Sequence, residues 1–167
     1  MKIMRYIPIL LGLCVFQAHA ADTIRLAVSG VSCTSTGTLP GMTALSWSMG
    51  ASAPVSSTGA SVGKVALSAL AVQRAFDECS PVLLSDFFKG THIATVTLTQ
   101  YAANPEGAML PSMVVTLTGV LIESYAIGGT STADAAETWS FSYTKVCLKN
   151  STNGAQACYS SATGAAS

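Results

Sequence analysis

The segment from residue 76 to residue 90 constrains the fold most, because it places one short helix between two strand-like halves. Ser80 is a typical N-cap residue, and Pro81 suits the first helical position, where its missing N–H costs nothing. Asp77 complements the positive end of such a helix, and Gly90 can take the left-handed conformation that ends it. The 3.6-residue period places four apolar side chains on one face: Leu83, Leu84, Phe87 and Phe88. A helix this short is marginal alone, so this face is expected to pack on a sheet.

On both sides of this segment, apolar and polar residues alternate with the period of two that is typical of strands. Strands are expected at residues 24–28, 42–49, 93–101, 113–125 and 138–149. Residues 62–76 are apolar but rich in alanine, so strand and helix both stay open there. In the last strand, the aromatic side chains are expected in the core: Trp139, Phe141 and Tyr143. The pattern predicts a mainly β fold, a two-sheet β-barrel or sandwich with one short α-helix alongside.

The N-terminus has the features of a secretory signal peptide. Lys2 and Arg5 precede an apolar run at residues 7–16, and Ala18 and Ala20 supply the small residues of a cleavage site. We therefore expect cleavage after Ala20 and a location in the periplasm or outside the cell. No later apolar run is long enough for a membrane span.

This leader divides the chain into three parts. Residues 1–20 are expected to be the signal peptide, and residues 21–150 a single β-barrel domain. Residues 151–167 are small and polar, which predicts a mobile tail except where Cys158 holds it.

Four cysteines follow the leader, an even number that predicts two disulfides in an exported protein: Cys33, Cys79, Cys147 and Cys158. Four cysteines allow three pairings, and the sequence does not choose among them. The pairing preferred here joins Cys147 to Cys158, which would fasten the tail, and Cys33 to Cys79. The cysteine spacing fits no zinc motif, and His92 is the only histidine after the leader, so no metal or cofactor is expected.

Charge and motifs argue against nucleic-acid binding and against catalysis. Without the leader, six basic side chains face eight carboxylates, and no basic stripe exists for a phosphate backbone. Ser80 is the only serine in a distinctive setting, and its N-cap role accounts for it. No Gly-x-Ser-x-Gly motif surrounds Ser80 and His92 is its only candidate partner, so the chain is not expected to be an enzyme.

Three separated segments resemble the haemolysin-coregulated protein (Hcp) family, the tube subunit of type VI secretion systems. The segments are residues 72–90, the strand at 93–101, and the strand at 137–146 with its Glu, Tyr and Lys positions. The motif residues of the first segment are Arg74, Asp77, Ser80, Pro81 and Gly90. Order, spacing and residue type agree across all three segments, roughly from residue 62 to residue 149.

The resemblance implies a subunit of hexameric rings that stack into a tube, with a secreted effector or a spike protein as partner. The signal peptide and the cysteines depart from family members, which assemble in the cytoplasm. The function expected is therefore an exported Hcp-like ring-forming component of a type VI secretion system, as tube subunit or effector carrier. The alternative is a non-assembling periplasmic or surface β-domain that binds a protein or glycan partner. An export-dependent toxin is a third interpretation.

One polar strand face is the candidate for a subunit contact or for the lining of a ring's lumen. Its residues are Thr95, Thr97 and Thr99, and Glu137 and Lys145 could pair within or between subunits. An ordinary solvated sheet face would show the same pattern, because threonine is a common strand residue. Alternation alone does not decide between the two.

Overall fold

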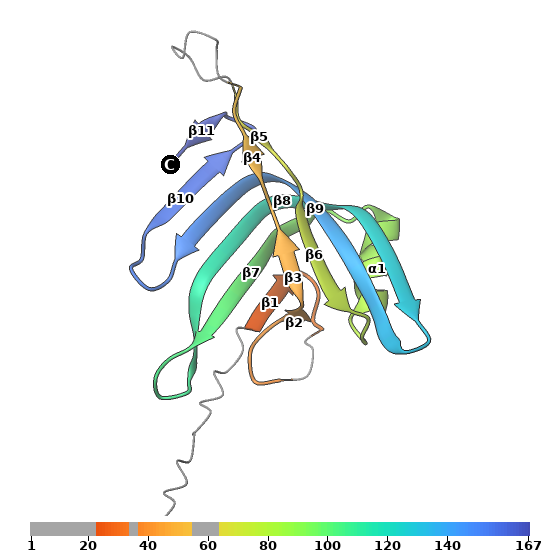
Figure 1. Cartoon of the computed structure of the whole chain (residues 1–167). Coiled ribbons are helices and arrows are strands. Elements are labelled where there is room, and N and C mark those ends of the chain that lie inside the picture. Colours follow the sequence, from red (N-terminus) through yellow and green to blue (C-terminus); the bar gives the residue numbers. More distant parts are fainter. Residues whose placement is uncertain (1–22, 34–36, 55–63) are drawn as a thin grey trace, which may run out of the picture.

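The computed structural model describes residues 23–33, 37–54 and 64–167 (Figure 1). The expected signal peptide and its cleavage site lie outside these residues. The described chain is mainly strand, with a single helix, α1, at Ser80–Lys89. The strands are β1 (Thr23–Val28), β2 (Met42–Ala44), β3 (Ser46–Ser48), β4 (Ala51–Ser52), β5 (Ala66–Leu67), β6 (Leu70–Ala75), β7 (Ile93–Ala103), β8 (Met109–Thr130), β9 (Ala133–Asn150), β10 (Gln156–Ser160) and β11 (Ala165–Ala166).

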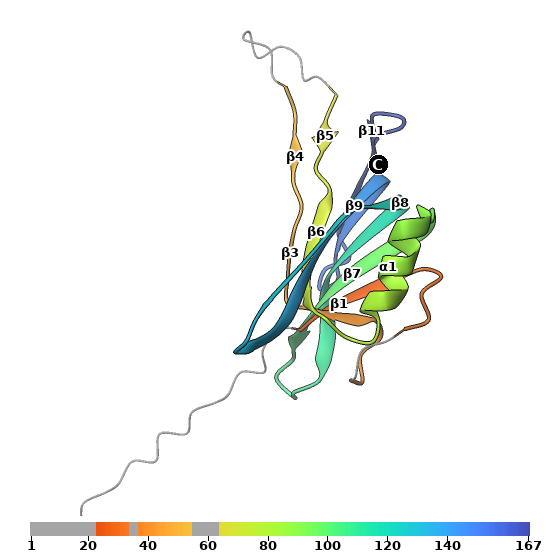
Figure 2. The same cartoon turned by 90° about the vertical axis from the view of Figure 1, so that its right-hand side faces the viewer.

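One large antiparallel sheet holds most of the strands together. Its path runs β11-β10-β9-β8-β7-β1-β2, and β6 joins it through β9 while β3 pairs with β6. One edge of β9 is shared, because residues 136–141 pair with β6 and residues 145–149 pair with β10. In Figure 2, α1 lies on one side of this sheet, and the small two-stranded sheet β4–β5 projects away on the other.

The expected strand at residues 42–49 is divided in the structure. β2 pairs with β1, whereas β3 pairs with β6, and the change of partner occurs at Leu45. This break bends the sheet back on itself, so the fold is a sandwich and not a closed barrel. In the open segment at 62–76, the residues that the structure describes form strands, β5 and β6, and no helix.

Helix α1 has the expected place, with a proline in its first turn and a left-handed glycine, Gly90, at its end with φ of 61°. The N-cap residue is Cys79 rather than Ser80, and no side chain caps this end. Leu83 is fully buried, and Leu84 and Phe87 pack against the core. Phe88 was expected on the same face but is 75% exposed, because the apolar stripe of so short a helix is wider than its contact with the sheet.

The core lies between the bent halves of the main sheet and under α1. Trp139 and Phe141 are fully buried, as expected, and Tyr143 packs beside them. Their neighbours include branched or sulfur-containing side chains from five other strands: Leu26, Met42, Leu70, Val72, Val96, Leu98, Leu117 and Val120. Burial of one strand face explains the period-two alternation in the sequence.

The C-terminal segment differs from the expectation of a mobile tail. β10 pairs with β9 over five residues, and β11 folds back on β10. The last residue, Ser167, exchanges two backbone hydrogen bonds with Cys158. Its small polar side chains gave no strand signal, because this strand is held by backbone pairing. No helix in the described part of the chain is long and apolar enough to cross a membrane.

Candidate functional site

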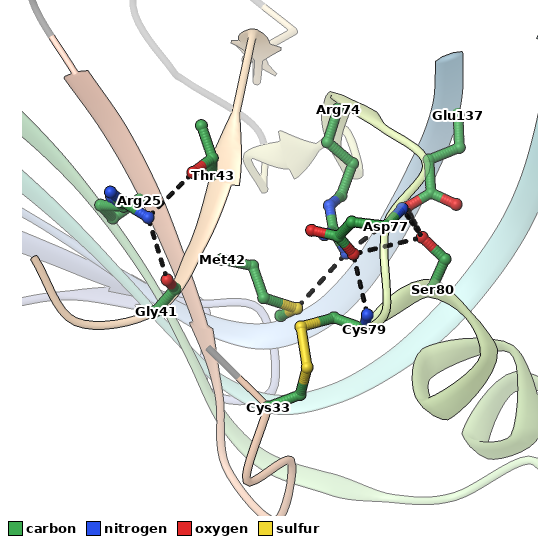
Figure 3. A network of polar contacts seen from close by, with 10 residues as sticks. All are labelled: Arg25, Cys33, Gly41, Met42, Thr43, Arg74, Asp77, Cys79, Ser80 and Glu137. Carbon is green, nitrogen blue, oxygen red and sulfur yellow. Dashed lines mark hydrogen bonds and ion pairs between the residues drawn. A yellow bond between two sulfur atoms is a disulfide. The ribbon is translucent and has the colours of Figure 1, made fainter. Parts of the chain in front are cut away.

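A buried ion-pair network forms where β6 leads into α1 (Figure 3). Arg74, on β6, is fully buried, and its guanidinium contacts two carboxylates. Its Nη2 atom pairs with Oδ2 of Asp77, and its Nη1 atom lies 3.4 Å from Oε1 of Glu137 on β9. Arg74 and Glu137 are also direct partners in the β6–β9 ladder. A buried charge must be paired, so the two strands and the helix start are held in one arrangement.

The hydroxyl of Ser80 ties the helix to β9. It donates to Oε1 of Glu137 at 2.8 Å and accepts from the backbone N–H of Asp77 at 3.0 Å. Oδ1 of Asp77 accepts from the backbone N–H of Cys79 at 2.9 Å, so Asp77 supports the first turn as expected. Ser80 is buried and its hydroxyl is bound to a carboxylate, while His92 is exposed. The side chain therefore has a structural role and not that of a nucleophile.

A disulfide fastens a further segment to the same point. Cys79 at the start of α1 is bonded to Cys33, which follows β1. Nη1 of Arg74 also lies 3.4 Å from the sulfur of Met42 on β2. Figure 3 shows these side chains converging from β2, β6, β9, α1 and the segment after β1. We call this cluster of Cys33, Arg74, Asp77, Cys79, Ser80 and Glu137 the helix junction.

An aromatic pair lies beside the helix junction. The rings of Tyr125 on β8 and Trp139 on β9 are 4.3 Å apart between centroids. Burial raises the pKa of the Tyr125 phenol, and the nearby Glu137 carboxylate raises it further. Burial likewise raises the pKa of Tyr143, whose hydroxyl donates to the carbonyl of Ser68 at 2.9 Å. Both phenols therefore release their protons less readily than a free tyrosine does.

The three candidate threonines share one sheet face. Cross-strand partners lie on the same face, and the register joins Thr95 to Thr118 and Thr118 to Lys145. The next row joins Thr97 to Thr116, and then to Cys147 and Cys158. We call this surface the threonine face, defined by Thr95, Thr97, Thr99, Thr116, Thr118 and Lys145.

Glu137 does not belong to the threonine face, which corrects its expected role. It is 1% exposed and pairs with Arg74, so it reaches neither a lumen nor a neighbouring subunit. It also cannot pair with Lys145 in the same chain, because they are separated by roughly 26 Å along β9 at ~3.3 Å per residue. The signal for the true pair was one charge at a core-facing position of each strand, and it needed the β6–β9 register to be interpreted.

The second disulfide lies on the threonine face. Cys147 on β9 and Cys158 on β10 are direct ladder partners, and their sulfurs are bonded. Both disulfides of the structure match the pairing preferred from the sequence. Within the described residues, no group of three metal-ligating side chains is found.

A second buried arginine was missed from the sequence. Arg25 on β1 occupies a polar position in the alternation, which predicts exposure, yet it is 7% exposed. Its Nη1 atom donates to Oγ1 of Thr43 at 2.8 Å and to the carbonyl of Gly41 at 3.3 Å (Figure 3). Gly37 lies so close that a Cβ there would be 2.5 Å from the Arg25 guanidinium. The loop before β2 covers this side chain, and no local pattern reports such a loop.

Comparison with known proteins gives one family match and several similar solved structures. The family model described as "Type VI secretion system effector, Hcp" matches residues 23–149. A solved structure described as a type six secretion system protein superposes with a TM-score of 0.74 at 19% identity, covering 88% of this chain and 100% of that chain. Hcp1 from Salmonella typhimurium gives 0.70 at 20% identity, covering 88% and 100%. A type VI secretion system effector from Yersinia pestis gives 0.65 at 21% identity, covering 82% and 98%. None of the curated proteins compared with the chain matches it.

Proposed function

Because this chain belongs to the Hcp family of type VI secretion, we propose that it is an exported component of that system that assembles into hexameric rings. Hcp is a structural tube protein and not an enzyme, in agreement with the motif content of the sequence. The proposal makes two claims about this chain, the ring in solution and the export route, and only the export route departs from the family.

The helix junction is the observation that carries the ring proposal. Arg74, Asp77 and Ser80 from the first motif segment meet Glu137 from the last one, and all four are held by ion pairs and hydrogen bonds. The motif is therefore used to join the helix to the sheet, which preserves the outline of the subunit. A ring is built from such a rigid outline, because each copy must present the same two surfaces in the same orientation.

The disulfides support the export proposal. Both bonds connect cysteines that follow the leader, and disulfides persist in oxidising compartments such as the bacterial periplasm. Cleavage after Ala20 would release residues 21–167 with all four of these cysteines. The partner in this proposal is a secreted effector or the spike protein, with the threonine face as the polar surface that lines the ring.

The first experiment is the solution mass of residues 21–167 by light scattering under non-reducing conditions. A mass of six subunits is expected over a range of concentrations. A single-subunit mass at the highest concentration would contradict the ring and favour a non-assembling β-domain that binds a protein or glycan partner. Mass spectrometry of protein from culture medium and periplasm tests export, with an N-terminus at Ala21 as the expected result.

A further inference from the structure

We propose that the disulfide between Cys147 and Cys158 locks the β4–β5 arm in position, and that this happens only when the chain reaches an oxidising compartment. The disulfide acts through Tyr159 on β10, which follows Cys158 in sequence and bonds to the arm. With two thiols in place of the disulfide, β10 is free to leave β9, and the arm loses this support. We call Cys147, Cys158 and Tyr159 the arm lock, which presupposes the export route proposed above.

The β4–β5 arm is too small to hold its own direction. Its ladder consists of two residue pairs, Ala51 with Leu67 and Ser52 with Ala66. Figure 2 shows the arm projecting away from the main sheet. A two-stranded ladder this short is marginal in water, so contacts outside the arm must fix its position.

Two tyrosine hydroxyls of the main sheet hold the β5 side of the arm. Tyr143 on β9 donates to the carbonyl of Ser68 at 2.9 Å, and Tyr159 on β10 donates to the carbonyl of Val65 at 3.3 Å. These two carbonyls lie on either side of β5, so each hydroxyl fixes one end of that strand. Tyr143 stands on a central strand, whereas the position of Tyr159 depends on whether β10 stays paired with β9.

The Cys147–Cys158 bond links β9 to β10 at the position beside Tyr159. The N–H and C=O of Cys158 both bond to Ser167, so they point away from Cys147. At this position the sulfurs therefore make the cross-strand link, and Tyr159 pairs with Val146 one residue further on. Consecutive side chains of a strand point to opposite faces, so the disulfide lies on the threonine face and the Tyr159 ring on the side of the arm.

Strand β10 lies near the edge of the sheet, where local opening is easiest. It pairs with β9 over five residues, and its outer edge pairs with the two residues of β11. Edge segments of this kind open at a small fraction of the free energy of global unfolding. A disulfide within the ladder suppresses that opening, because it joins β10 to β9 even when the hydrogen bonds break. The oxidised chain therefore keeps Tyr159 against the arm, and the reduced chain releases it.

Oxidation closes the arm lock. The thiols of Cys147 and Cys158 exchange with a disulfide-bearing oxidant: a new S–S bond forms, the S–S bond of the oxidant breaks, and both protons end on the sulfurs of the oxidant. The cytoplasm keeps thiols reduced, whereas compartments such as the periplasm oxidise them. Cys147 is half-buried on the threonine face, while Cys79 of the other disulfide is fully buried. The arm is therefore fixed only in the exported chain, and any contact that needs a fixed arm is confined to it.

Cleavage by trypsin measures the arm lock in purified residues 21–167. Lys64 is exposed and directly precedes Val65, whose carbonyl Tyr159 binds. The nearest basic side chains in sequence, Arg25 and Arg74, are buried. Cleavage after Lys64 gives a fragment that begins at Val65, which mass spectrometry detects after reduction, because the other disulfide joins the two pieces. The cleavage rate follows the population in which this segment is released.

Three variants and one control define the expected result. Replacing Cys147 and Cys158 with alanine should raise the cleavage rate at least about tenfold, because β10 is no longer kept closed. Tyr159→Phe keeps the disulfide but removes the hydroxyl, and it should raise the rate roughly two- to tenfold. In the chain without this disulfide, Tyr159→Phe should add little, since the same support is already lost. Tyr101→Phe is the matched control, because it lies near the turn between β7 and β8, at the end of the molecule opposite the arm (Figure 1).

Circular dichroism verifies that each variant is folded. A wild-type cleavage rate without the Cys147–Cys158 bond would overturn the arm lock, and so would a wild-type rate for Tyr159→Phe. Increases that multiply in the combined variant would show that disulfide and hydroxyl act separately, which also contradicts the inference. Because the assay uses purified protein, failure of the arm lock is distinct from failure of the proposed function, which a single-subunit mass or an uncleaved leader would reveal.

Discussion

Two ends of this molecule are each fastened by a disulfide, but by different physical means. At the helix junction, Cys33 and Cys79 are 46 residues apart, and the bond lies against a network of buried charges. At the β10 edge, Cys147 and Cys158 are 11 residues apart and are already neighbours in a ladder of backbone pairs. The Cys33–Cys79 bond joins segments from distant parts of the chain. The Cys147–Cys158 bond reinforces a local hairpin.

This difference indicates where the fold should tolerate amino-acid substitutions. A ladder continues through any side chain that suits a strand, so the β10 edge depends little on residue identity. The helix junction depends on particular charges, since Arg74 and Glu137 are both buried and neither can be left without the other. We therefore expect the family motif to be necessary because of burial, and not because of an exposed chemical group.

The largest effect is expected for Arg74→Met. The variant leaves Glu137 buried without its cation, which should lower the free energy of unfolding by about 3–5 kcal/mol. Chemical denaturation of residues 21–167 measures this loss. Lys145→Met, an exposed change at the other end, should stay within about 0.5 kcal/mol of wild type.

A double variant sharpens this prediction. Replacing both Arg74 and Glu137 with methionine removes the unpaired charge, and it should recover a large part of the lost stability. A double variant no more stable than Arg74→Met would mean that the two charges are not coupled, contrary to the structure.

The two disulfides should differ in their contribution. Removing both cysteines of the Cys33–Cys79 pair as alanines should cost about 4 kcal/mol, because the bond closes a long loop. The same change at Cys147 and Cys158 should cost about 3 kcal/mol, since its loop is short. Denaturation curves of the two variants, compared under identical conditions, measure the order. An equal or reversed order would show that native-state contacts, and not loop length, decide the difference.

Thiol labelling tests the pairing itself. In native protein from an oxidising compartment, all four cysteines should be blocked until a reductant is added. Peptide mapping should find Cys33 with Cys79 and Cys147 with Cys158. Free thiols at Cys147 and Cys158 would contradict both the pairing and the proposed location.

The smallest effect concerns pH. The pKa values of Tyr125 and Tyr143 are raised from 10.0, so the folded protein retains protons that the unfolded chain releases. Stability should be unaffected below pH 10 and should fall as the pH rises above it. Denaturation at pH 9 and pH 11 should show this fall in the wild type, and the double variant Tyr125→Phe, Tyr143→Phe should reduce it. An unchanged fall in the double variant would assign the loss to other groups.

Much of the fold could be predicted from the sequence because its signals are local. Period-two alternation located β1 and β7 within about two residues and β8 and β9 within about five, and Pro81 and Gly90 bounded the helix. The resemblance brought Arg74, Asp77 and Ser80 together as one motif. The contacts of that motif could not be predicted, because they depend on Glu137, which is distant in sequence.

The missed features have a common physical cause. Arg25 is buried by a loop, and Phe88 is left uncovered by the sheet. The C-terminal segment forms a strand because it pairs with the free edge of β9. Each outcome depends on what a distant segment covers, and hydrophobic pattern reports only what a residue's own strand or helix favours.

The sequence by itself therefore determined the class of the fold, the single helix, the even set of cysteines and the resemblance to Hcp. Only the tertiary structure decided which faces are covered, that Glu137 pairs with Arg74 and not with Lys145, and that β10 completes the edge of β9. The reason is that alternation assigns residues to one of two faces, whereas burial and charge pairing arise when segments far apart in the chain meet.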